Sequence, residues 1–218
     1  AMGSNRDYGT GPGQTTVNLP LHATGTGSVY KMITLAAALH EGYTESDLAF
    51  SSRCPLVDSR YDTPDGGITN SDSCSLQGGY MDYRTATALS SNTWFSELEI
   101  KVGVEKVKEF SASVGLSAPD NITSRSLAYT LGVTENSEVA MAAAFATFSN
   151  GGIYCPPTPV STFSYADGTS PVVPDTYDPK TDSCRRVLSE KDSGVVLKAM
   201  RANVSGEIPN AFGNKFNT

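Results

Sequence analysis

The sequence is poor in the residues that bind metal ions and nucleic acids. Its 218 residues include only two histidines, and no two of its four cysteines have the C-x-x-C spacing that is typical of zinc sites. The net charge is −7, and the longest basic cluster is the pair Arg185-Arg186, so the positive surface that phosphate backbones require is lacking. We therefore expect no metal site and no nucleic-acid partner.

Long hydrophobic runs are lacking as well. The longest largely apolar run covers residues 32–39, whereas a membrane-spanning helix needs ~20 apolar residues. A hydrophobic fraction of 39% is nevertheless enough to bury a core, which excludes a wholly disordered chain. The length suits one domain or a large fragment of one. We expect a soluble, folded chain.

The four cysteines allow two interpretations. They are either buried thiols of a cytosolic protein or two disulfides formed in an oxidising compartment. Of the three possible connectivities, pairing Cys54 with Cys74 and Cys155 with Cys184 closes the shortest loops. The stretches between these cysteines are rich in Ser, Asp, Thr, Gly or Pro, as expected of loops. We favour an exported protein with these two disulfides.

The hydrophobic pattern predicts a helix-rich α/β chain. Apolar residues recur at helical spacing in six segments, most of them bounded by Gly, Ser or Asn. The predicted helices cover residues 28–40, 83–89, 93–102, 104–114, 138–148 and 189–203. Strand character is confined to residues 153–165, while residues 5–27 and the polar segment 51–80 lack a regular period. We therefore expect few strands.

The first predicted helix carries a serine and a lysine three residues apart. Positions i and i+3 lie on one face of a helix, so the Lys31 amine can meet the Ser28 hydroxyl. Apolar surroundings lower the pKa of a lysine, which lets it act as a base, and free N–H groups at a helix N-terminus can hold an oxyanion. By itself, however, S-x-x-K is a common chance match, and serine is an ordinary helix cap.

A second polar cluster, Ser90-Ser91-Asn92, interrupts two apolar helices further along the chain. Ser90 could relay a proton to a leaving group, and the Asn92 amide could hold both Lys31 and a substrate carbonyl. Serine and asparagine also fill helix breaks for capping reasons. The tripeptide suggests a catalytic role only because an S-x-x-K helix precedes it.

Together these motifs resemble those of penicillin-binding protein transpeptidase domains. Residues 27–39 resemble the family's nucleophile helix, and residues 90–95 resemble its S-x-N motif with the threonine and aromatic residues that follow. Leu131-Gly132-Val133 and residues 141–152 are similar to a further stretch of the class A, bifunctional members, and the cysteine placement resembles actinobacterial ones. The resemblance implies the fold shared with serine β-lactamases, here helix-rich α/β (α+β) with an incomplete antiparallel sheet.

The resemblance also implies a role for each motif residue. Ser28 is expected to be the nucleophile and Lys31 the base for acylation. Ser90 and Asn92 are expected to relay protons and to position the substrate. No metal or organic cofactor is needed for this chemistry.

Two further residues stand where the family binds its substrate, namely Gly27 beside the nucleophile and Trp94 after the S-x-N motif. We predict substrate contacts for both. For Trp94, as for Phe95, a place in the hydrophobic core is the simpler interpretation of the helical pattern.

The family's third motif, K-[ST]-G, is missing from this sequence. The nearest candidate is Asn214-Lys215-Phe216-Asn217-Thr218, which does not match. We therefore expect residues 1–218 to be part of a single transpeptidase domain, without the strands that carry K-[ST]-G and without a glycosyltransferase domain. A companion chain or fragment would supply the missing motif.

The implied function is that of a peptidoglycan D,D-transpeptidase, which cross-links stem peptides and is acylated by β-lactams. One alternative is a serine β-lactamase, but the E-x-x-L-N motif of class A enzymes does not occur between Asn92 and Asn150. Another is a β-lactam receptor that is acylated without turnover. We expect the parent protein to be anchored in the membrane and to act at its extracytoplasmic face, with stem peptides and β-lactams as ligands.

Overall fold

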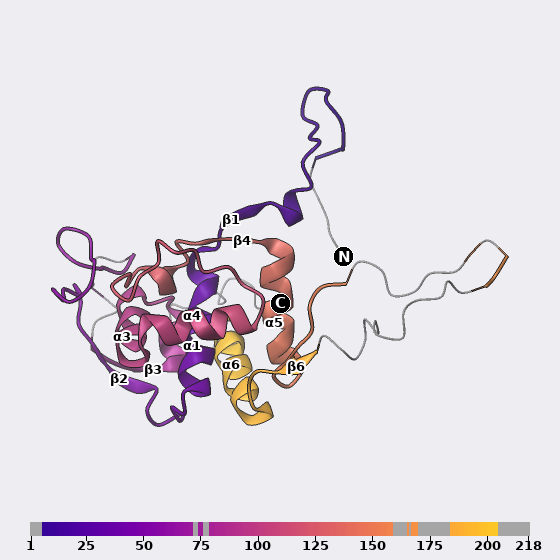
Figure 1. Ribbon diagram of the computed structural model, residues 1–218. Helices are drawn as coiled ribbons and strands as arrows, with labels where there is room; N and C mark the ends of the chain where they lie inside the picture. The colour runs from indigo at the N-terminus through magenta and orange to yellow at the C-terminus, as the bar shows by residue number, and fades with distance from the viewer. Residues whose placement is uncertain are drawn as a thin grey trace.

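The computed structural model describes residues 6–71, 74–75, 79–158, 165, 167–169 and 184–204. In this part of the chain, α-helices form a compact body, and the segment that precedes β1 stands away from it (Figure 1). The helices are α1 (Lys31–His40), α2 (Tyr83–Ala88), α3 (Asn92–Val102), α4 (Val104–Ser113), α5 (Glu138–Ser149) and α6 (Glu190–Ala202). Three short 3-10 turns are η1 (Leu19–Leu21), η2 (Gly27–Tyr30) and η3 (Tyr129–Leu131).

Helix α1 lies at the centre of the helical body. Every residue from Lys31 to Leu39 is buried, because α1 contacts α3, α4 and α6. The run Ala36–Ala38 has no exposed surface, and its small side chains let the neighbouring helices approach closely. Burying this helix removes its apolar surface from water, which is the main force that stabilises the fold. It also buries the lysine at the first position of the helix.

Side-chain caps explain where four of the helices begin. The caps of α2, α3, α5 and α6 are Asp82, Ser91, Ser137 and Ser189, and each accepts a hydrogen bond from the backbone N–H three residues later. Such a cap satisfies one of the free N–H groups in the first helical turn. The predictions for the five helices α2 to α6 are confirmed to within one residue at each end.

The first predicted helix begins differently from the prediction. Its first turn, η2, is a 3-10 turn, and the α-helix starts only at Lys31. The backbone N–H of Lys31 donates to the carbonyls of both Ser28 and Val29, which marks the transition. Residues i and i+3 eclipse each other in a 3-10 turn, so Ser28 and Lys31 lie on the same side of the chain.

The strands described here form three separate antiparallel pairs. They are β1 (Ala23–Gly25) with β4 (Glu135–Ser137), β2 (Ala49–Ser52) with β3 (Gly79–Asp82), and β5 (Ile153–Tyr154) with β6 (Arg185–Arg186). In register, Ala23 lies opposite Ser137 and Ala49 lies opposite Asp82. The first pair joins the segment before Ser28 to the segment before α5.

Most of these strands were not predicted. Strands of two to four residues are too short to show an alternating pattern, and each one here exists only through a partner that is distant in the sequence. Of the strand character predicted for residues 153–165, the structure shows only β5, and residues 159–164 lie outside the described part. The C-terminal candidate at residues 214–218 lies outside it as well.

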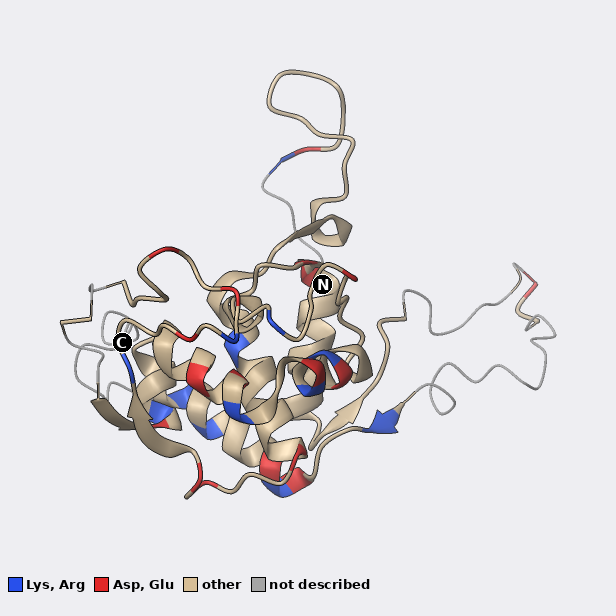
Figure 2. Ribbon diagram, turned by 60° about the vertical axis from the view of Figure 1, so that its left-hand side comes forward, with Lys and Arg blue, Asp and Glu red and all other residues tan. Residues whose placement is uncertain are grey.

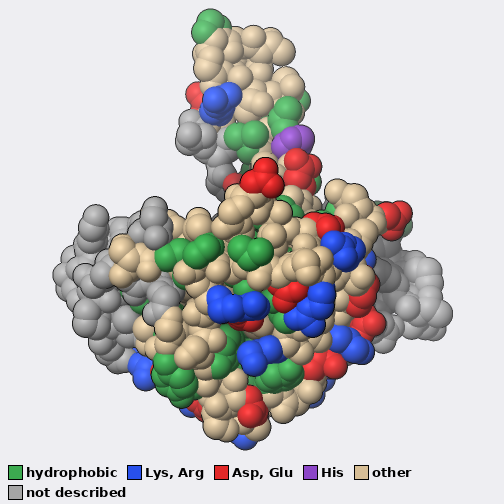
Figure 3. Space-filling view, turned by 90° about the vertical axis from the view of Figure 1, so that its left-hand side faces the viewer, with side chains coloured by type: hydrophobic (Ala, Val, Ile, Leu, Met, Phe, Trp, Pro, Cys, Tyr) green, Lys and Arg blue, Asp and Glu red, His purple; other side chains and the backbone are tan. Residues whose placement is uncertain are grey.

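Charged side chains of both signs are spread over the molecule. Figure 2 shows acidic and basic positions on the same helices and loops, and on the face drawn in Figure 3 they are mixed with hydrophobic side chains. Some form surface ion pairs, such as Arg53 with Glu97 at 2.7 Å, and exposed pairs of this kind contribute little to stability. Among the described residues, no helix has the length and apolar character to cross a membrane.

Two backbone segments meet immediately before Ser28. The N–H of Gly27 donates to the carbonyl of Gly132 at 3.2 Å, and the Thr26 hydroxyl donates to the same oxygen at 3.5 Å. Gly132 has a φ of +75°, and a Cβ atom there would lie 2.1 Å from the Gly27 carbonyl oxygen. A larger residue at 132 would therefore displace the chain next to Ser28.

We predict that Gly132→Ala destabilises the protein more than Gly66→Ala. Gly66 also has a positive φ, +84°, but no atom lies within 4 Å of the position that its Cβ would take. Both changes carry the backbone cost of about 1–2 kcal/mol, whereas only Gly132→Ala adds an overlap that costs about 1–3 kcal/mol more. Urea unfolding of the two variants measures the difference, and equal losses would contradict the close contact with Gly27.

Candidate active site

A pocket of about 240 Å³ opens at the N-terminal end of α1. It is formed by η2, the start of α1, the turn between α2 and α3, and parts of α3, α5 and α6. Its lining residues are Ser28, Val29, Lys31, Met32, Thr87, Ser90, Phe95, Phe145, Met200, Asn203 and Val204. Among these residues, Lys31 carries the only ionisable side chain. The wall is mainly apolar, and the polar groups gather around the lysine.

The Lys31 amine has three hydrogen-bond partners. Its Nζ donates to the carbonyl of Ser90 at 2.6 Å, to Ser90 Oγ at 3.1 Å and to Asn92 Oδ1 at 2.8 Å. The ring of Phe95 lies below it, with its centroid 5.8 Å from Nζ. Three acceptors match the three protons of an ammonium group, so the amine can be buried in either protonation state.

Burial shifts the titration of this amine. Lys31 is 1% exposed, and the loss of hydration lowers its pKa to about 7. The acceptors around it are neutral carbonyl, hydroxyl and amide oxygens, which do not restore the charge stabilisation that a carboxylate would give. At neutral pH a large fraction of the Lys31 amine is therefore uncharged and able to take a proton.

The backbone of Ser90 makes this arrangement possible. Ser90 has a φ of +53°, in the left-handed region that residues other than glycine rarely adopt. In this conformation both its carbonyl oxygen and its hydroxyl reach Lys31. The next residue, Ser91, caps α3, and Asn92 is the first residue of that helix. One tight turn thus provides all three acceptors.

Ser28 lies at the edge of the same pocket. Its side chain is exposed, in contrast to Lys31, and within the described residues its hydroxyl has no hydrogen-bond partner. An exposed hydroxyl at the first turn of a helix can meet a bound carbonyl group, and the N–H groups of that turn can stabilise an oxyanion. The serine and the lysine therefore occupy complementary positions, one open to ligands and one shielded.

Buried hydrogen bonds fix the turn that joins Ser28 to Lys31. The Tyr30 hydroxyl donates to Ser111 Oγ at 2.7 Å and also hydrogen-bonds the Tyr129 hydroxyl. Burial, followed by the neighbouring Tyr129, raises the pKa of Tyr30, so this phenol stays neutral. One turn further along α1, the hydroxyls of Thr34 and Thr130 lie 2.7 Å apart. These contacts anchor the start of α1 to α4 and η3.

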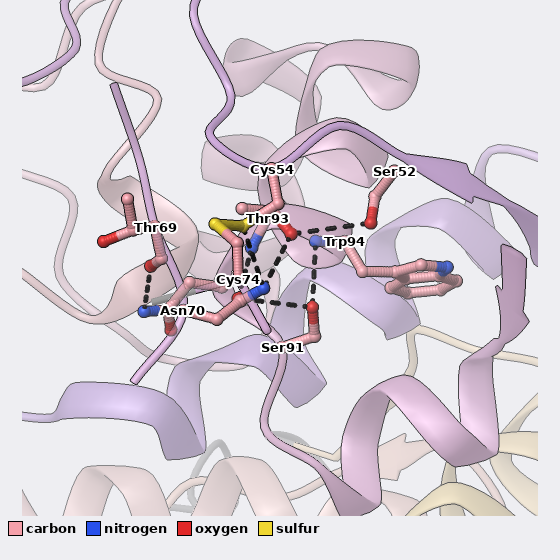
Figure 4. Close-up of a disulfide and its surroundings, with 9 residues drawn as sticks. Ser52, Cys54, Thr69, Asn70, Cys74, Ser91, Thr93 and Trp94 are labelled. Carbon is pink, nitrogen blue, oxygen red and sulfur yellow. Dashed lines mark hydrogen bonds between the residues drawn. A yellow bond between two sulfur atoms is a disulfide. The ribbon is translucent and has the colours of Figure 1, made fainter. Parts of the chain in front are cut away.

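A disulfide lies close to the turn that carries Ser90 and Asn92. The structure pairs Cys54 with Cys74 and Cys155 with Cys184, as predicted from the sequence. Figure 4 shows the first of these bonds beside the residues that begin α3. This disulfide closes a loop that reaches the site, whereas the second joins the segments that carry β5 and β6.

The four residues predicted to be catalytic come together in the structure. Ser28, Lys31 and Ser90 line one pocket, and Asn92 joins them through its hydrogen bond to Lys31. Gly27 is exposed and directly precedes Ser28. Its contact with a substrate stays a prediction.

Trp94 takes the position in the core that the helical pattern favours, and the structure does not place it in the wall of the pocket. Trp94 has no exposed surface, and its ring stacks on that of Phe50 with 4.5 Å between the centroids. Its Nε1–H donates to the Met81 carbonyl at 3.2 Å, which satisfies the only polar group of the side chain. Trp94 faces the core because the helical period of α3 turns it away from Asn92.

Sequence reasoning missed several residues of the pocket wall. Thr87, Phe145 and Met200 come from three helices that lie apart in the sequence, and Asn203 follows the last of these helices. Each fits the apolar or terminal pattern of its own helix, so no local pattern marks it as part of a site. No group of three His, Cys, Asp or Glu side chains in the described ranges is placed to hold a metal ion.

These features give the chain a serine–lysine pair, in which a buried amine of low pKa lies one turn from an exposed hydroxyl. The chain belongs to the penicillin-binding protein transpeptidase family, because the model of the penicillin binding protein transpeptidase domain matches residues 1–212. No curated protein matches the chain. The fold is accordingly the transpeptidase fold, and β-lactam acyl-enzyme complexes are known among its structural neighbours.

Solved structures show the same fold. An imipenem acyl-enzyme complex of penicillin-binding protein A from Mycobacterium tuberculosis has a TM-score of 0.69 at 22% identity, over 91% of this chain and 49% of that one. The PonA1 protein from the same organism, in complex with penicillin V, has a TM-score of 0.65 at 25% identity, over 84% and 48%. A peptidoglycan synthetase from Bifidobacterium adolescentis has a TM-score of 0.69 at 15% identity, over 88% and 36%. This chain therefore spans about half the length of the mycobacterial structures, and about a third of the last.

We predict that the Lys31 amine titrates close to neutral pH. In a ¹³C NMR titration, its Cε signal should have a midpoint at about 7, and the signal should disappear in Lys31→Met. The same shift makes stability depend on pH. Above about pH 7 the folded chain has released a proton that the unfolded chain keeps, so the free energy of unfolding rises with pH.

The slope of this rise is at most about 1.4 kcal/mol per pH unit up to the ordinary lysine pKa. Urea unfolding of the wild type and Lys31→Met between about pH 7 and about pH 9 measures it, because the variant lacks this contribution. A midpoint at the ordinary lysine value would contradict the burial of the amine.

We also predict that Ser90→Gly and Ser90→Ala differ in stability although both remove the hydroxyl. Glycine adopts the φ of +53° without strain, whereas alanine retains the cost of about 1 kcal/mol. Both variants remove one acceptor from Lys31, so the pKa of its amine should fall further in both. Urea unfolding measures the difference in stability between the two variants, and titration of Lys31 measures the fall in its pKa. Equal free energies of unfolding for Ser90→Gly and Ser90→Ala would contradict the left-handed backbone of Ser90.

Proposed function

We propose that this chain carries the nucleophile and base of a peptidoglycan D,D-transpeptidase. The observation that supports it most directly is the environment of Lys31, a buried amine with a pKa of about 7 that Ser90 and Asn92 hold beside an exposed serine. An amine with this pKa is available as a general base at neutral pH. Membership of the transpeptidase family supports the same reaction type.

In the proposed acylation step, Ser28 attacks the carbonyl carbon of the penultimate D-Ala of a stem peptide. A bond forms between Ser28 Oγ and that carbon, and the hydroxyl proton moves to Lys31 Nζ. The C–N bond to the terminal D-Ala then breaks, and the leaving amine takes a proton by way of Ser90 Oγ, which lies 3.1 Å from the Lys31 amine. The products are an acyl-enzyme and free D-Ala.

The transition state of this step carries negative charge on the carbonyl oxygen. The backbone N–H of Ser28 would donate to this oxygen from the first turn before α1. The second donor would come from the strand that carries K-[ST]-G, on a companion chain or fragment. Asn92 keeps Lys31 in place through its Oδ1, 2.8 Å from the amine.

In the second step, the amine of another stem peptide attacks the acyl carbon. A new amide bond forms, the ester bond to Ser28 breaks, and the proton of the attacking amine returns to the serine through Lys31. A β-lactam would follow the first step only. Its leaving amine stays attached to the opened ring, so the adduct persists on Ser28.

The proposed location follows from the disulfides and from the substrate. Two disulfides indicate an oxidising compartment, and stem peptides of the cell wall lie outside the cytoplasmic membrane. We therefore place the reaction at the extracytoplasmic face, in a parent protein that is anchored in the membrane. Every group in the proposed chemistry is a protein group, with no metal or organic cofactor.

Intact mass spectrometry tests this proposal. The purified chain, with any polypeptide that accompanies it, is denatured before and after incubation with benzylpenicillin. We expect this chain to gain the mass of the drug, and a companion polypeptide to contain K-[ST]-G. Ser28→Ala should abolish the adduct, because the nucleophile is lost.

Ser59→Ala is the matched control, because Ser59 is an exposed serine in a loop away from the pocket, and it should keep the adduct. An adduct that forms and disappears within seconds would identify a β-lactamase instead. A wild-type chain that gains no adduct although a polypeptide with K-[ST]-G accompanies it would contradict the assignment of Ser28 as the nucleophile.

A further inference from the structure

The described residues 53–71 and 74–75 belong to a loop that packs against the turn carrying Ser90 and Asn92. Two backbone hydrogen bonds join Leu56 and Ile68 across this loop, at 2.8 and 2.9 Å. The side chains of Leu56 and Ile68 also form a small buried hydrophobic cluster with Leu127, which packs the loop against a neighbouring segment. The bond between Cys54 and Cys74 closes its base.

Asn70 of this loop contacts the first turn of α3, as Figure 4 shows. Its Oδ1 accepts from the backbone N–H of Thr93 at 3.1 Å and from Ser91 Oγ at 3.4 Å. Its Nδ2 donates to Thr93 Oγ1 at 3.1 Å. A side chain from another segment thus satisfies an N–H group that the helix itself leaves without an acceptor. Asn70 is 5% exposed, so water does not easily replace it.

The neighbouring residue, Thr69, holds the side chain of Asn92. Asn92 Nδ2 donates to the Thr69 carbonyl at 2.9 Å, while Asn92 Oδ1 accepts from Lys31 at 2.8 Å (Figure 4 shows Thr69). A carbonyl oxygen can only accept and an ammonium group can only donate. The two partners together leave one orientation for the Asn92 amide, with its oxygen toward Lys31.

This orientation matters for the base. A reversed amide would point its oxygen at the Thr69 carbonyl, where neither oxygen can donate, and it would lose the hydrogen bond from Lys31 whenever that amine is protonated. Lys31 would then keep only the two oxygens of Ser90. The backbone carbonyl of Thr69 therefore selects the form of Asn92 that supports Lys31, from a loop outside both motifs.

The Cys54–Cys74 disulfide contacts Asn70, the residue that joins the loop to α3. Asn70 Nδ2 lies 3.4 Å from Cys54 Sγ, and Cys74 follows Asn70 closely in the chain. The bond thus holds both ends of the loop next to α3. The other disulfide, Cys155–Cys184, joins the segments that carry β5 and β6, outside this loop.

We propose that Asn70 is a positioning residue for Asn92, and that the Cys54–Cys74 disulfide keeps it in place. Loss of either one lets the Asn92 amide leave its orientation toward Lys31 and slows the acylation of Ser28. This role rests on the proposed function for its kinetic consequence, but the orientation of Asn92 can be measured without any substrate.

The kinetic test compares four variants of the chain together with any polypeptide that accompanies it. In Asn70→Ala and in the double variant Cys54→Ala/Cys74→Ala, the rate of acylation by benzylpenicillin should fall about ten- to hundredfold, as expected when a catalytic group is misplaced. The matched control Cys155→Ala/Cys184→Ala should stay close to the wild type. Asn70→Asp retains the acceptor for the Thr93 N–H and should restore most of the rate.

A second measurement reads the orientation directly. The side-chain NH₂ signals of Asn92, assigned by their loss in Asn92→Asp, should move in Asn70→Ala and in the Cys54→Ala/Cys74→Ala variant. They should remain in place in the Cys155→Ala/Cys184→Ala control. Circular dichroism identifies any variant that has not folded. If either Asn70→Ala or Cys54→Ala/Cys74→Ala does not fold, the other variant carries the test.

The outcomes separate this inference from the proposed function. A wild type that is never acylated, with Asn92 signals that move as expected, would overturn the transpeptidase proposal and support the positioning role. Acylation and Asn92 signals that are unchanged in Asn70→Ala would overturn the positioning role. Equal effects in the two disulfide variants would overturn it too, because they would indicate a general loss of stability.

Discussion

A lysine amine can be buried only where its protons have acceptors, and the surroundings of Lys31 meet that requirement. Among the described residues of the pocket wall, the amine is the one ionisable group, and three neutral oxygens of Ser90 and Asn92 surround it. Burial removes water from the charged form and lowers the pKa of Lys31 to about 7, while the neutral oxygens provide acceptors for its protons. The chemistry available to Ser28 depends on this balance between burial and hydrogen bonding.

Several parts of the fold keep Lys31 both buried and hydrogen-bonded. Helix α1 is buried on all sides, which removes water from Lys31, and the left-handed backbone of Ser90 turns two oxygens toward the amine. Buried hydroxyls below Tyr30 anchor the turn that begins with Ser28. On the other side of the turn between α2 and α3, a disulfide-closed loop contacts the first residues of α3. The site thus lies where rigid helices and a braced loop meet.

Features that depend on residues near each other in the sequence could be predicted, whereas features that depend on distant segments could not. Helices α2 to α6 were predicted within one residue, because side-chain caps and helical periodicity are local. The short strands, the 3-10 turn at Ser28 and the wall residue Met200 were not predicted, since each depends on a distant partner. For Trp94 the family motif suggests a substrate contact and the helical pattern favours the core, and packing against Phe50 places its ring in the core.

The motifs of the sequence indicate the family, its cysteine spacing favours the two disulfide pairs, and its motif residues Ser28, Lys31, Ser90 and Asn92 are those that gather at the pocket. Residue types and spacings carry that information, because chemistry of this kind needs particular side chains in a particular order. The depth at which Lys31 is buried, the oxygens that face it and the orientation of the Asn92 amide could be learned from the three-dimensional arrangement alone. Those properties arise from contacts between segments far apart in the chain, where hydration is lost and each donor finds its acceptor.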